Sequence, residues 1–558
     1  MRVVAPLLLA FSTTVLAPGE GCGGDPDGPP DGSVFFNYDV TAYNYIFDVA
    51  SGTSLSSVDF TTLDSGNCIS LDFRLSEASA VTLDGITPDW YGVLADTLQV
   101  CGATLTPGSH HTLSVNVHVP LETENGTDVG YSSTRDTEGQ PFYYLLSWVE
   151  GCSLFGPCYD DPDDFVEITF RVTHPVGYTV LCSGTVTNSP EEGVCTNTFA
   201  GVPTYTGVGF MVSPSWKKSD LFTQNGVTVS LFDMPGAGAL AATDEGALAG
   251  YFGWLESQLG PYPYGDTLRY VIGPHYWWGF EHPGNIALSD AVVGAIGSYQ
   301  DTLLHTMMHE LTHQWAGNFS TLESTNNFVW KEAAAEYLTF VYEAEHLPPT
   351  YPTRTLRVWK SNALAVGYYP VPLEEPDLFD FYSDVYGSGP FVLFRQLEGL
   401  FSRSQVVAAL GDVLGSEDPQ FVSVETIKSA LELHTGADLT QYFNDWVYGS
   451  GAPRWPIVGV RWEDPDGDGT YTINVTQTQG SNTIYGFKAT LRLEGAGSEV
   501  MDVPFSFGVD GTTSSIVVEA RPGFVISSIV VDPYDEALVT PQGASRMDPL
   551  PGYPAGGF

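Results

Sequence analysis

Apolar residues change their spacing twice along this chain, and the changes limit the folds open to it. From about residue 33 to residue 215, runs such as "HTLSVNVHV" and "DFVEITFRVTH" alternate apolar and polar residues, which is typical of β-strands. From 216 to 452, segments such as "KEAAAEYLTFVYEAEH" carry apolar residues at helical spacing. Alternation returns from 453 to 535, as in "TYTINVTQTQ".

These blocks predict a multidomain α+β protein. A chain of 558 residues is too long for one core, and about three domains are expected. We predict an N-terminal all-β domain at 33–215, a mainly helical central domain at 216–452 and a small C-terminal β-sandwich at 453–535. A Gly/Asp/Pro-rich linker is expected at 23–32 and a Pro- and Gly-rich tail at 536–558.

Residues 1–22 have the pattern of a secretory signal peptide. One positive charge precedes about a dozen apolar residues and then small ones. The run is too short to span a membrane, and no other segment is long enough, so we expect no transmembrane segment. The protein is predicted to be exported, as a secreted or a cell-surface or periplasmic protein. Cys22 is a candidate lipid anchor, although Gly19 and Glu20 fit a lipobox poorly; the alternative is an unpaired thiol in the leader.

Six of the seven cysteines fall inside the predicted N-terminal β domain. In an oxidising compartment they are expected to form disulfides, and six cysteines allow about fifteen pairings. Proximity in sequence favours Cys68–Cys101, Cys152–Cys158 and Cys182–Cys195.

The charge is strongly acidic, with 67 Asp and Glu against 20 Lys and Arg, for a net charge of −47. Such a surface repels nucleic acids and anionic membranes, so we expect neither as a partner. It favours neutral or cationic small substrates.

The stretch "LLHTMMHELTHQWAGN" predicts a zinc-binding helix. His309 and His313 are four residues apart, so they share one face of a helix, where two imidazoles can bind the same Zn²⁺. Glu310 follows the first histidine, where its carboxylate can reach a water at the metal and act as a general base. The alternative is a buried helix that happens to carry two histidines.

A catalytic zinc ion needs a third protein ligand, and Glu332 is the main candidate. It lies in the helical stretch "WKEAAAEYLTF", 18 intervening residues after His313, which is enough for a loop and an antiparallel helix. Glu336, one turn later, is a rival ligand, but we favour a supporting contact to a ligand for it. His305 is expected to be a packed or hydrogen-bonded histidine rather than a ligand.

The motifs "HELTHQWAGN" and "WKEAAAEY" resemble HExxHxWxGN and NEGFA of the aminopeptidase N-like family of gluzincin metallopeptidases. Segments such as "FGPCYDDPDDFVEITFRVTHP" and "LTQYFNDWVYGSGAP" extend the resemblance over nearly the whole chain. It implies that the central domain is a thermolysin-like zincin domain with one Zn²⁺, and that the substrates are peptides with a free N-terminus.

The resemblance also implies two further site residues. Glu281, in "YWWGFEHPGNIALSD", matches the glutamate with which the family binds the substrate's α-amine, although its flanking residues differ. Tyr386, in "SDVYGSGPF", matches the tyrosine that donates a hydrogen bond to the oxyanion, and Tyr382 is its main competitor.

The sequence departs from the family pattern in two places. The family's helical C-terminal domain has no counterpart, and Ser147-Trp148 replaces the Thr-Gln pair that helps to hold the substrate. We therefore retain two alternatives to an aminopeptidase: a gluzincin endopeptidase, and an inactive surface binding protein on a peptidase fold.

The segment "DPDGDGTY" starts like a calcium loop, with Asp464, Asp466 and Asp468 in alternation. The twelfth position of such a loop would be Val475 and not a carboxylate. A tight hairpin between two strands is the alternative explanation.

Overall fold

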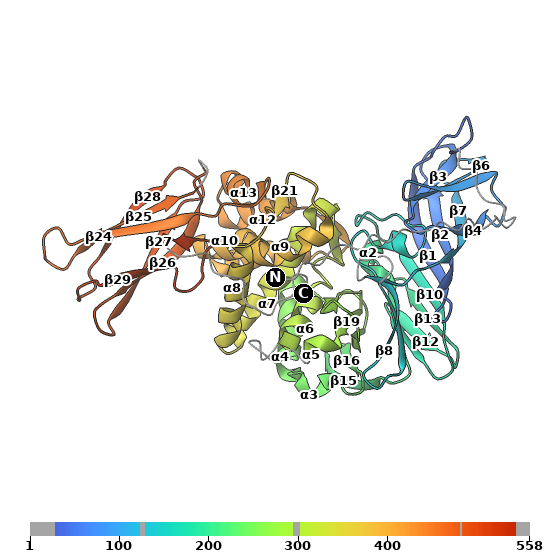
Figure 1. Ribbon diagram of the computed structural model, residues 1–558, viewed down its shortest axis with the longest axis horizontal. Coiled ribbons are helices and arrows are strands. Elements are labelled where there is room, and N and C mark those ends of the chain that lie inside the picture. The colour runs from blue at the N-terminus through green and yellow to red at the C-terminus, as the bar shows by residue number, and fades with distance from the viewer. Residues whose placement is uncertain (1–27, 123–128, 294–301, 480–482, 543–558) are drawn as a thin grey trace, which may run out of the picture.

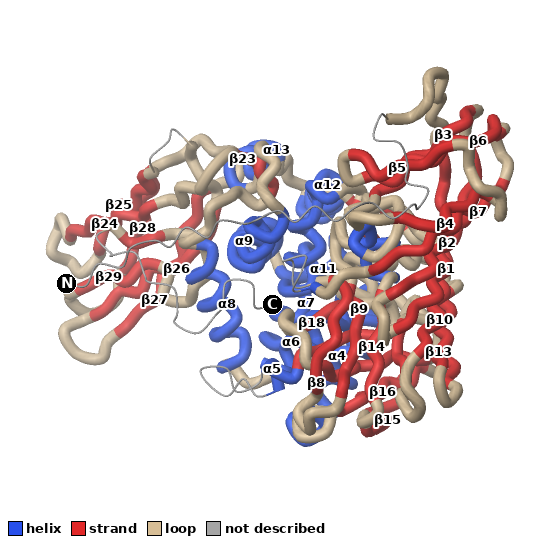
Figure 2. Tube along the Cα trace, turned by 45° about the vertical axis from the view of Figure 1, so that its right-hand side comes forward, coloured by secondary structure: helices blue, strands red, loops and turns tan. Residues whose placement is uncertain are grey.

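The computed structural model describes residues 28–122, 129–293, 302–479 and 483–542. It is a multidomain α+β structure in which a helical region lies between two β-rich regions, so the molecule is elongated (Figure 1). A view turned by 45° shows the same order, with helices in the middle and strands on both sides (Figure 2). The expected signal peptide, Cys22 and the last residues of the expected tail lie outside the described residues.

Three sheets build the N-terminal region. The largest has the order β12-β13-β10-β1-β2-β7-β4 and is antiparallel except where β1 pairs with β10. Its strands are β1 (Tyr38–Asp48), β2 (Thr53–Thr62), β4 (Ala78–Leu83), β7 (His110–His118), β10 (Glu167–Thr173), β12 (Thr185–Asn188) and β13 (Glu192–Asn197). The second sheet contains β3 (Gly66–Asp72), β5 (Trp90–Leu94) and β6 (Thr97–Leu105); the third contains β8 (Gly130–Arg135), β9 (Pro141–Leu146), β11 (Thr179–Cys182) and β14 (Gly209–Ser213).

The sequence pattern of these strands follows their burial. In β2 every second residue is buried, because successive side chains of a strand point to opposite faces. The three disulfides favoured from sequence proximity are all formed: Cys68–Cys101, Cys152–Cys158 and Cys182–Cys195. The short helices η1 (Cys152–Leu154) and α2 (Thr204–Gly207) interrupt this β-rich region.

The central region contains a sheet that its helical sequence pattern does not predict. The sheet has the order β15-β16-β17-β19-β18. Its strands are β15 (Lys217–Gln224), β16 (Val227–Asp233), β17 (Thr267–Gly273), β18 (Gly279–Phe280) and β19 (Asn285–Ser289). Segments with strong helical spacing lie between β16 and β17 and after β19, so the alternation of these strands is weak beside them.

Helices make up most of the rest of the central region. They are α3 (Ala239–Ala242), α4 (Glu245–Leu259), α5 (Asp290–Val293), α6 (Thr302–Thr312), η2 (Thr325–Asn327), α7 (Phe328–His346), α8 (Thr350–Ala363), α9 (Leu378–Pro390), η3 (Phe391–Arg395), α10 (Gln396–Leu400), α11 (Arg403–Leu414), α12 (Val424–Thr435) and α13 (Thr440–Trp446). Two pairs of short strands join the loops: β20 (Ser320–Leu322) with β22 (Gln420–Val422), and β21 (Val371–Pro372) with β23 (Tyr448–Gly449). Among the described helices, none is both long enough and apolar enough to cross a membrane.

Helix α7 lies at the centre of this region, and its residues from Phe328 to Glu343 are buried. Helix α9 packs closely against it at Gly389, where a Cβ would lie 2.8 Å from Cγ2 of Val329. A glycine at this point therefore lets α9 approach α7, and the approach brings two tyrosines of α9 to the face of α7 that carries Glu332.

The C-terminal region contains two sheets. One has the order β28-β25-β24-β30 and the other β27-β26-β29. The strands are β24 (Ile457–Glu463), β25 (Tyr471–Thr478), β26 (Phe487–Glu494), β27 (Val500–Phe507), β28 (Ser515–Ala520), β29 (Ser528–Val531) and β30 (Thr540–Pro541). Because β30 pairs with β24, the sandwich includes residues that the sequence pattern assigns to the tail.

The Asp464–Asp468 segment forms the turn between β24 and β25. The Asp464 carboxylate accepts a hydrogen bond from the Gly469 amide, and the Asp468 carboxylate accepts one from the Thr470 amide. These bonds within the turn support the hairpin explanation of the Asp/Gly pattern.

Candidate metal centre

His309 on α6 and His313, just beyond its end, point into the same space. Their Nε2 atoms lie 3.0 Å apart, as expected for histidines one helical turn apart. Nδ1 of His313 lies 2.8 Å from the carbonyl oxygen of Ala316. A carbonyl can only accept, so Nδ1 carries the proton and Nε2 keeps its lone pair for a metal.

Glu332 of α7 supplies the third group. Its Oε2 lies 3.4 Å from Nε2 of His309 and 3.4 Å from Nε2 of His313. A tetrahedral zinc ion with bonds of about 2.0–2.1 Å separates its ligand atoms by about 3.3 Å. The three observed separations fit that requirement. Among the described residues, these three side chains are brought together as a group able to hold a metal ion.

The two rival ligands lie behind this cluster. Oε1 of Glu336 is 3.1 Å from Nδ1 of His309, on the side of the ring away from Glu332, and its Oε2 accepts a hydrogen bond from the Trp359 indole at 2.8 Å. Nδ1 of His305 lies 2.7 Å from Glu343. Glu336 is thus placed to orient His309, and His305 contacts carboxylates of α7 instead of the cluster.

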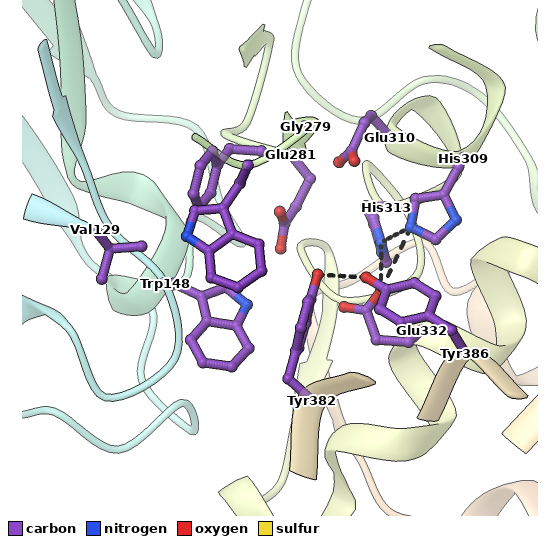
Figure 3. Close-up of a pocket in the computed structure, with 12 residues that line it drawn as sticks. Val129, Trp148, Gly279, Glu281, His309, Glu310, His313, Glu332, Tyr382 and Tyr386 are labelled. Atoms are coloured by element: carbon purple, nitrogen blue, oxygen red, sulfur yellow. Dashed lines mark hydrogen bonds and ion pairs between the residues drawn. The ribbon is translucent and has the colours of Figure 1, made fainter. Parts of the chain in front are cut away.

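The cluster forms one wall of a pocket between the N-terminal and central regions (Figure 3). Figure 3 shows Glu281, Glu310 and Tyr382 pointing toward a common space, with Trp148 and Val129 on the side of the N-terminal region. The residues that line the pocket are Val129, Trp148, Trp277, Gly279, Phe280, Glu281, His309, Glu310, His313, Glu332, Tyr382 and Tyr386. All six of the site residues predicted from the sequence are among them.

The loop that carries Glu281 is held by the segment that follows the zinc-binding motif. Glu281 lies in the turn between β18 and β19, and its carbonyl accepts hydrogen bonds from the side chains of Gln314 and Asn318, at 2.9 and 2.6 Å. Gly279 of the same loop faces Glu310 so closely that a Cβ there would overlap the Glu310 carboxylate. The segment carrying Glu281 therefore packs closely against Glu310, the candidate general base.

Lys331, to which the sequence patterns assign no function, is buried next to the site. Its Nζ lies 2.7 Å from Oε1 of Glu281 and 2.5 Å from Oε1 of Glu332. A lysine directly before the candidate ligand Glu332 was the signal available in the sequence. The contact of Lys331 with Glu281 could not be predicted from the spacing of nearby residues in the sequence.

Buried carboxylates dominate the electrostatics of the site. Burial disfavours protonated His309, but Glu332 and Glu336 outweigh this effect and raise its pKa to about 10. Burial raises the pKa of Glu310 to about 8, against the effect of His309. Burial would raise the pKa of Glu332, but Lys331 and His313 hold it well below its ordinary value. Such an excess of buried negative charge favours a bound cation.

Both tyrosine candidates reach the pocket. The Tyr386 hydroxyl donates a hydrogen bond to Oε2 of Glu332 at 2.9 Å, and the hydroxyls of Tyr382 and Tyr386 bond to each other. The Tyr382 ring also packs edge-on against Trp148 and Trp277, with centroid distances of 4.8 and 5.5 Å. Tyr386 is the nearer of the two to the cluster, while Tyr382 belongs to the aromatic wall.

His309, His313 and Glu332 thus come together beside Glu281, which lies in a hairpin turn. No family model matches the sequence. The sequence is 22% identical to aminopeptidase N of Streptomyces lividans, over 89% of this chain and 62% of that protein. It is 25% identical to human aminopeptidase N over 46% of this chain and 29% of that protein, and 22% identical to leucine aminopeptidase 2 of Neosartorya fischeri over 77% and 74%.

The fold is similar to that of a solved aminopeptidase. Aminopeptidase A of Legionella pneumophila, solved with aspartic acid, superposes with a TM-score of 0.72 at 16% identity, over 91% of this chain and 60% of that one. The chain is therefore similar in sequence to aminopeptidases N and in fold to aminopeptidase A. It spans 29% and 62% of the length of the human and Streptomyces relatives.

Proposed function

We propose that this chain is an exported zinc aminopeptidase that removes the N-terminal residue from peptides. The observation that carries the proposal is the convergence of His309, His313 and Glu332, with Glu310 and Glu281, in one pocket. The three ligand atoms have separations that suit zinc, and the surrounding carboxylates favour a cation. Zinc at these ligands would supply a Lewis acid that polarises the scissile carbonyl and acidifies water.

Glu310 is the proposed general base. Its carboxylate lines the pocket but is not among the three ligands, so it is free to accept a proton from the attacking water and pass it to the leaving amine.

Tyr386 and Glu281 are the proposed substrate-positioning groups. The Tyr386 hydroxyl, next to Glu332, would donate a hydrogen bond to the carbonyl oxygen as negative charge develops on it. Glu281 would pair with the N-terminal ammonium of the peptide and so place the first peptide bond beside Glu310. Trp148, from the Ser147-Trp148 pair, would contribute an apolar wall to this pocket.

The gluzincin endopeptidase remains the second candidate, because one observation favours it. Glu281 already has a cationic partner, Lys331, so it is not a free anion awaiting an N-terminus. The intact ligand set argues against the third alternative, an inactive binding protein.

Export is part of the proposal. The three disulfides and the signal-like first 22 residues support it, with Cys22 as a candidate site for a lipid anchor. The net charge of −47 supports neutral or basic peptides as substrates.

Assays with amino-acid arylamides would test the activity. The purified protein should hydrolyse them, lose activity after chelation and regain it with zinc. Mass spectrometry of a longer unmodified peptide should show loss of single residues from its N-terminus. Internal fragments would favour the endopeptidase, and no hydrolysis of either kind by the zinc-loaded protein would refute the proposal.

A further inference from the structure

Lys331 lies between two carboxylates: that of Glu281, the proposed partner of the substrate's N-terminus, and that of Glu332, a proposed zinc ligand. Its side chain is 1% exposed, and its ammonium group contacts Glu281 at 2.7 Å and Glu332 at 2.5 Å. It is not among the residues that line the pocket. The ammonium therefore lies behind Glu281 and does not meet the substrate itself.

The surrounding residues hold Lys331 in this position. Its aliphatic chain passes over Gly317, where a Cβ would lie 2.7–2.9 Å from Cγ, Cδ and Cε of the lysine. Nζ lies 5.6 Å from the centre of the Phe328 ring. Gly317 has a φ of +116°, which favours glycine, so the turn after the zinc-binding motif leaves a channel that the lysine fills.

This placement changes what Glu281 offers to a ligand. A carboxylate with no partner would attract an N-terminal ammonium strongly in a buried pocket. Here the charge of Glu281 is already matched by Lys331, and a second ammonium beside Glu281 would also be repelled by the first. The preference of Glu281 for a charged over a neutral N-terminus is thereby weakened.

We propose that Lys331 is a specificity-determining residue that weakens the selection for a free N-terminal ammonium, so that peptides with neutral, acylated N-termini also bind. This inference rests on the proposed assignment of Glu281 to the substrate's N-terminus. The proposed role differs from that of a lysine that only balances buried charge. Replacing such a structural lysine would change the affinities for charged and neutral ligands alike.

Binding measurements can test the proposal without turnover. Leucine amide and N-acetyl-leucine amide are titrated against zinc-loaded protein carrying Glu310→Gln, and the fluorescence of Trp148 and Trp277 in the pocket reports binding. Adding Lys331→Gln removes the charge but keeps an amide that can donate to both carboxylates. It should lower the Kd of leucine amide by about tenfold or more. The Kd of the acetylated ligand should change less than about twofold.

Two controls locate the effect. Lys331→Arg keeps the positive charge and should leave the Kd of leucine amide close to its original value. In protein that also carries Glu281→Gln, adding Lys331→Gln should no longer improve leucine amide binding, because the group through which Lys331 acts is gone. Zinc content is measured for every variant, so a loss of metal is detected separately.

An unchanged or higher Kd for leucine amide in zinc-loaded Lys331→Gln protein would overturn the proposal, as would an equal gain for both ligands. If that variant does not fold, the protein with native Lys331 still tests the proposal. It should bind leucine amide less than about tenfold more tightly than N-acetyl-leucine amide, and a larger preference would overturn the proposal. Failure of the peptidase activity would be seen in the arylamide assay, whereas this comparison measures binding only.

Discussion

Nδ1 of His309 lies 3.1 Å from Oε1 of Glu336, one helical turn beyond the Glu332 carboxylate that faces the other nitrogen of the same ring. Two carboxylates of α7 thus face the two sides of one imidazole. We predict that Glu336→Gln weakens zinc binding by about 10- to 100-fold, because the ring loses the partner that orients it. Competition with a fluorescent chelator would measure the change.

Glu343→Gln is the matched control for this prediction. Glu343 lies on the same helix and contacts His305, which is not in the cluster. Its substitution should leave zinc affinity within about twofold. Equal losses in the two variants would show that Glu336 has no special relation to the metal site.

Glu310→Gln should separate metal binding from chemistry. The side chain is not one of the three ligands, so zinc should remain bound at one ion per chain. Turnover of an arylamide should fall by about 100-fold or more, because the amide cannot accept the proton. Metal analysis and kinetics on the same preparation check both parts, and activity close to that of the unmodified protein would remove Glu310 from the mechanism.

Gly279→Ala should disturb the position of the Glu310 carboxylate, which Gly279 faces. The added Cβ would overlap Glu310, so either that side chain or the loop carrying Glu281 must move. Displacements of about 1 Å can cost about 100-fold in rate, and we expect a loss of that order in kcat/KM with zinc retained. Gly246→Ala, at an exposed position of α4 where the Cβ meets only ordinary contact, should have no effect on kcat/KM.

Replacing each tyrosine with phenylalanine should rank the two candidates. Tyr386→Phe should lower kcat by about 100-fold or more with a smaller change in KM, because its hydrogen bond is needed mainly in the transition state. Tyr382→Phe should have the smaller effect on kcat, since Tyr382 belongs to the aromatic wall. The opposite order in steady-state kinetics would assign the oxyanion contact to Tyr382.

Acid should destabilise the fold around the Glu281 loop. Burial lowers the pKa of His282 to about 4, although Glu281 acts in the opposite direction. As pH falls from 6.5 toward 4, the unfolded chain takes up a proton that folded His282 does not, so stability present at neutral pH is lost. The loss from this residue is on the order of 3 kcal/mol.

Urea unfolding of metal-free protein at pH 7 and pH 4.5 would measure this loss without a contribution from released zinc. The decrease in unfolding free energy should be smaller in His282→Gln than in the unmodified protein, because the variant has no proton to take up at this position. Equal decreases would contradict the assignment.

The parts of the site that obey local periodicity were predictable from the sequence. The spacing of His309 and His313 places them on one helical face, and a loop of suitable length allows Glu332 to return on the next helix. The three disulfides join cysteines that are close in the sequence or on paired strands. The β-rich ends and the helical centre follow from alternating and helical apolar spacing.

The remaining parts depend on packing between distant segments. Trp148 enters the pocket from the N-terminal region, a position that the family resemblance at Ser147-Trp148 indicates but apolar spacing does not. Lys331 is buried only because Glu281, Glu332 and Gly317 surround it, and the hairpin carrying Glu281 is far away in the sequence. The five-stranded sheet of the central region was missed because its strands lie among stronger helical signals.

The central claim is that two imidazoles and one carboxylate bind a single zinc ion. A crystal of zinc-saturated protein, with anomalous diffraction measured on both sides of the zinc absorption edge, tests it most directly. We predict one strong peak at bonding distance from Nε2 of His309, Nε2 of His313 and an oxygen of Glu332. A map from fully occupied crystals with no peak there, or with the strongest peak bound by other residues, would contradict the account.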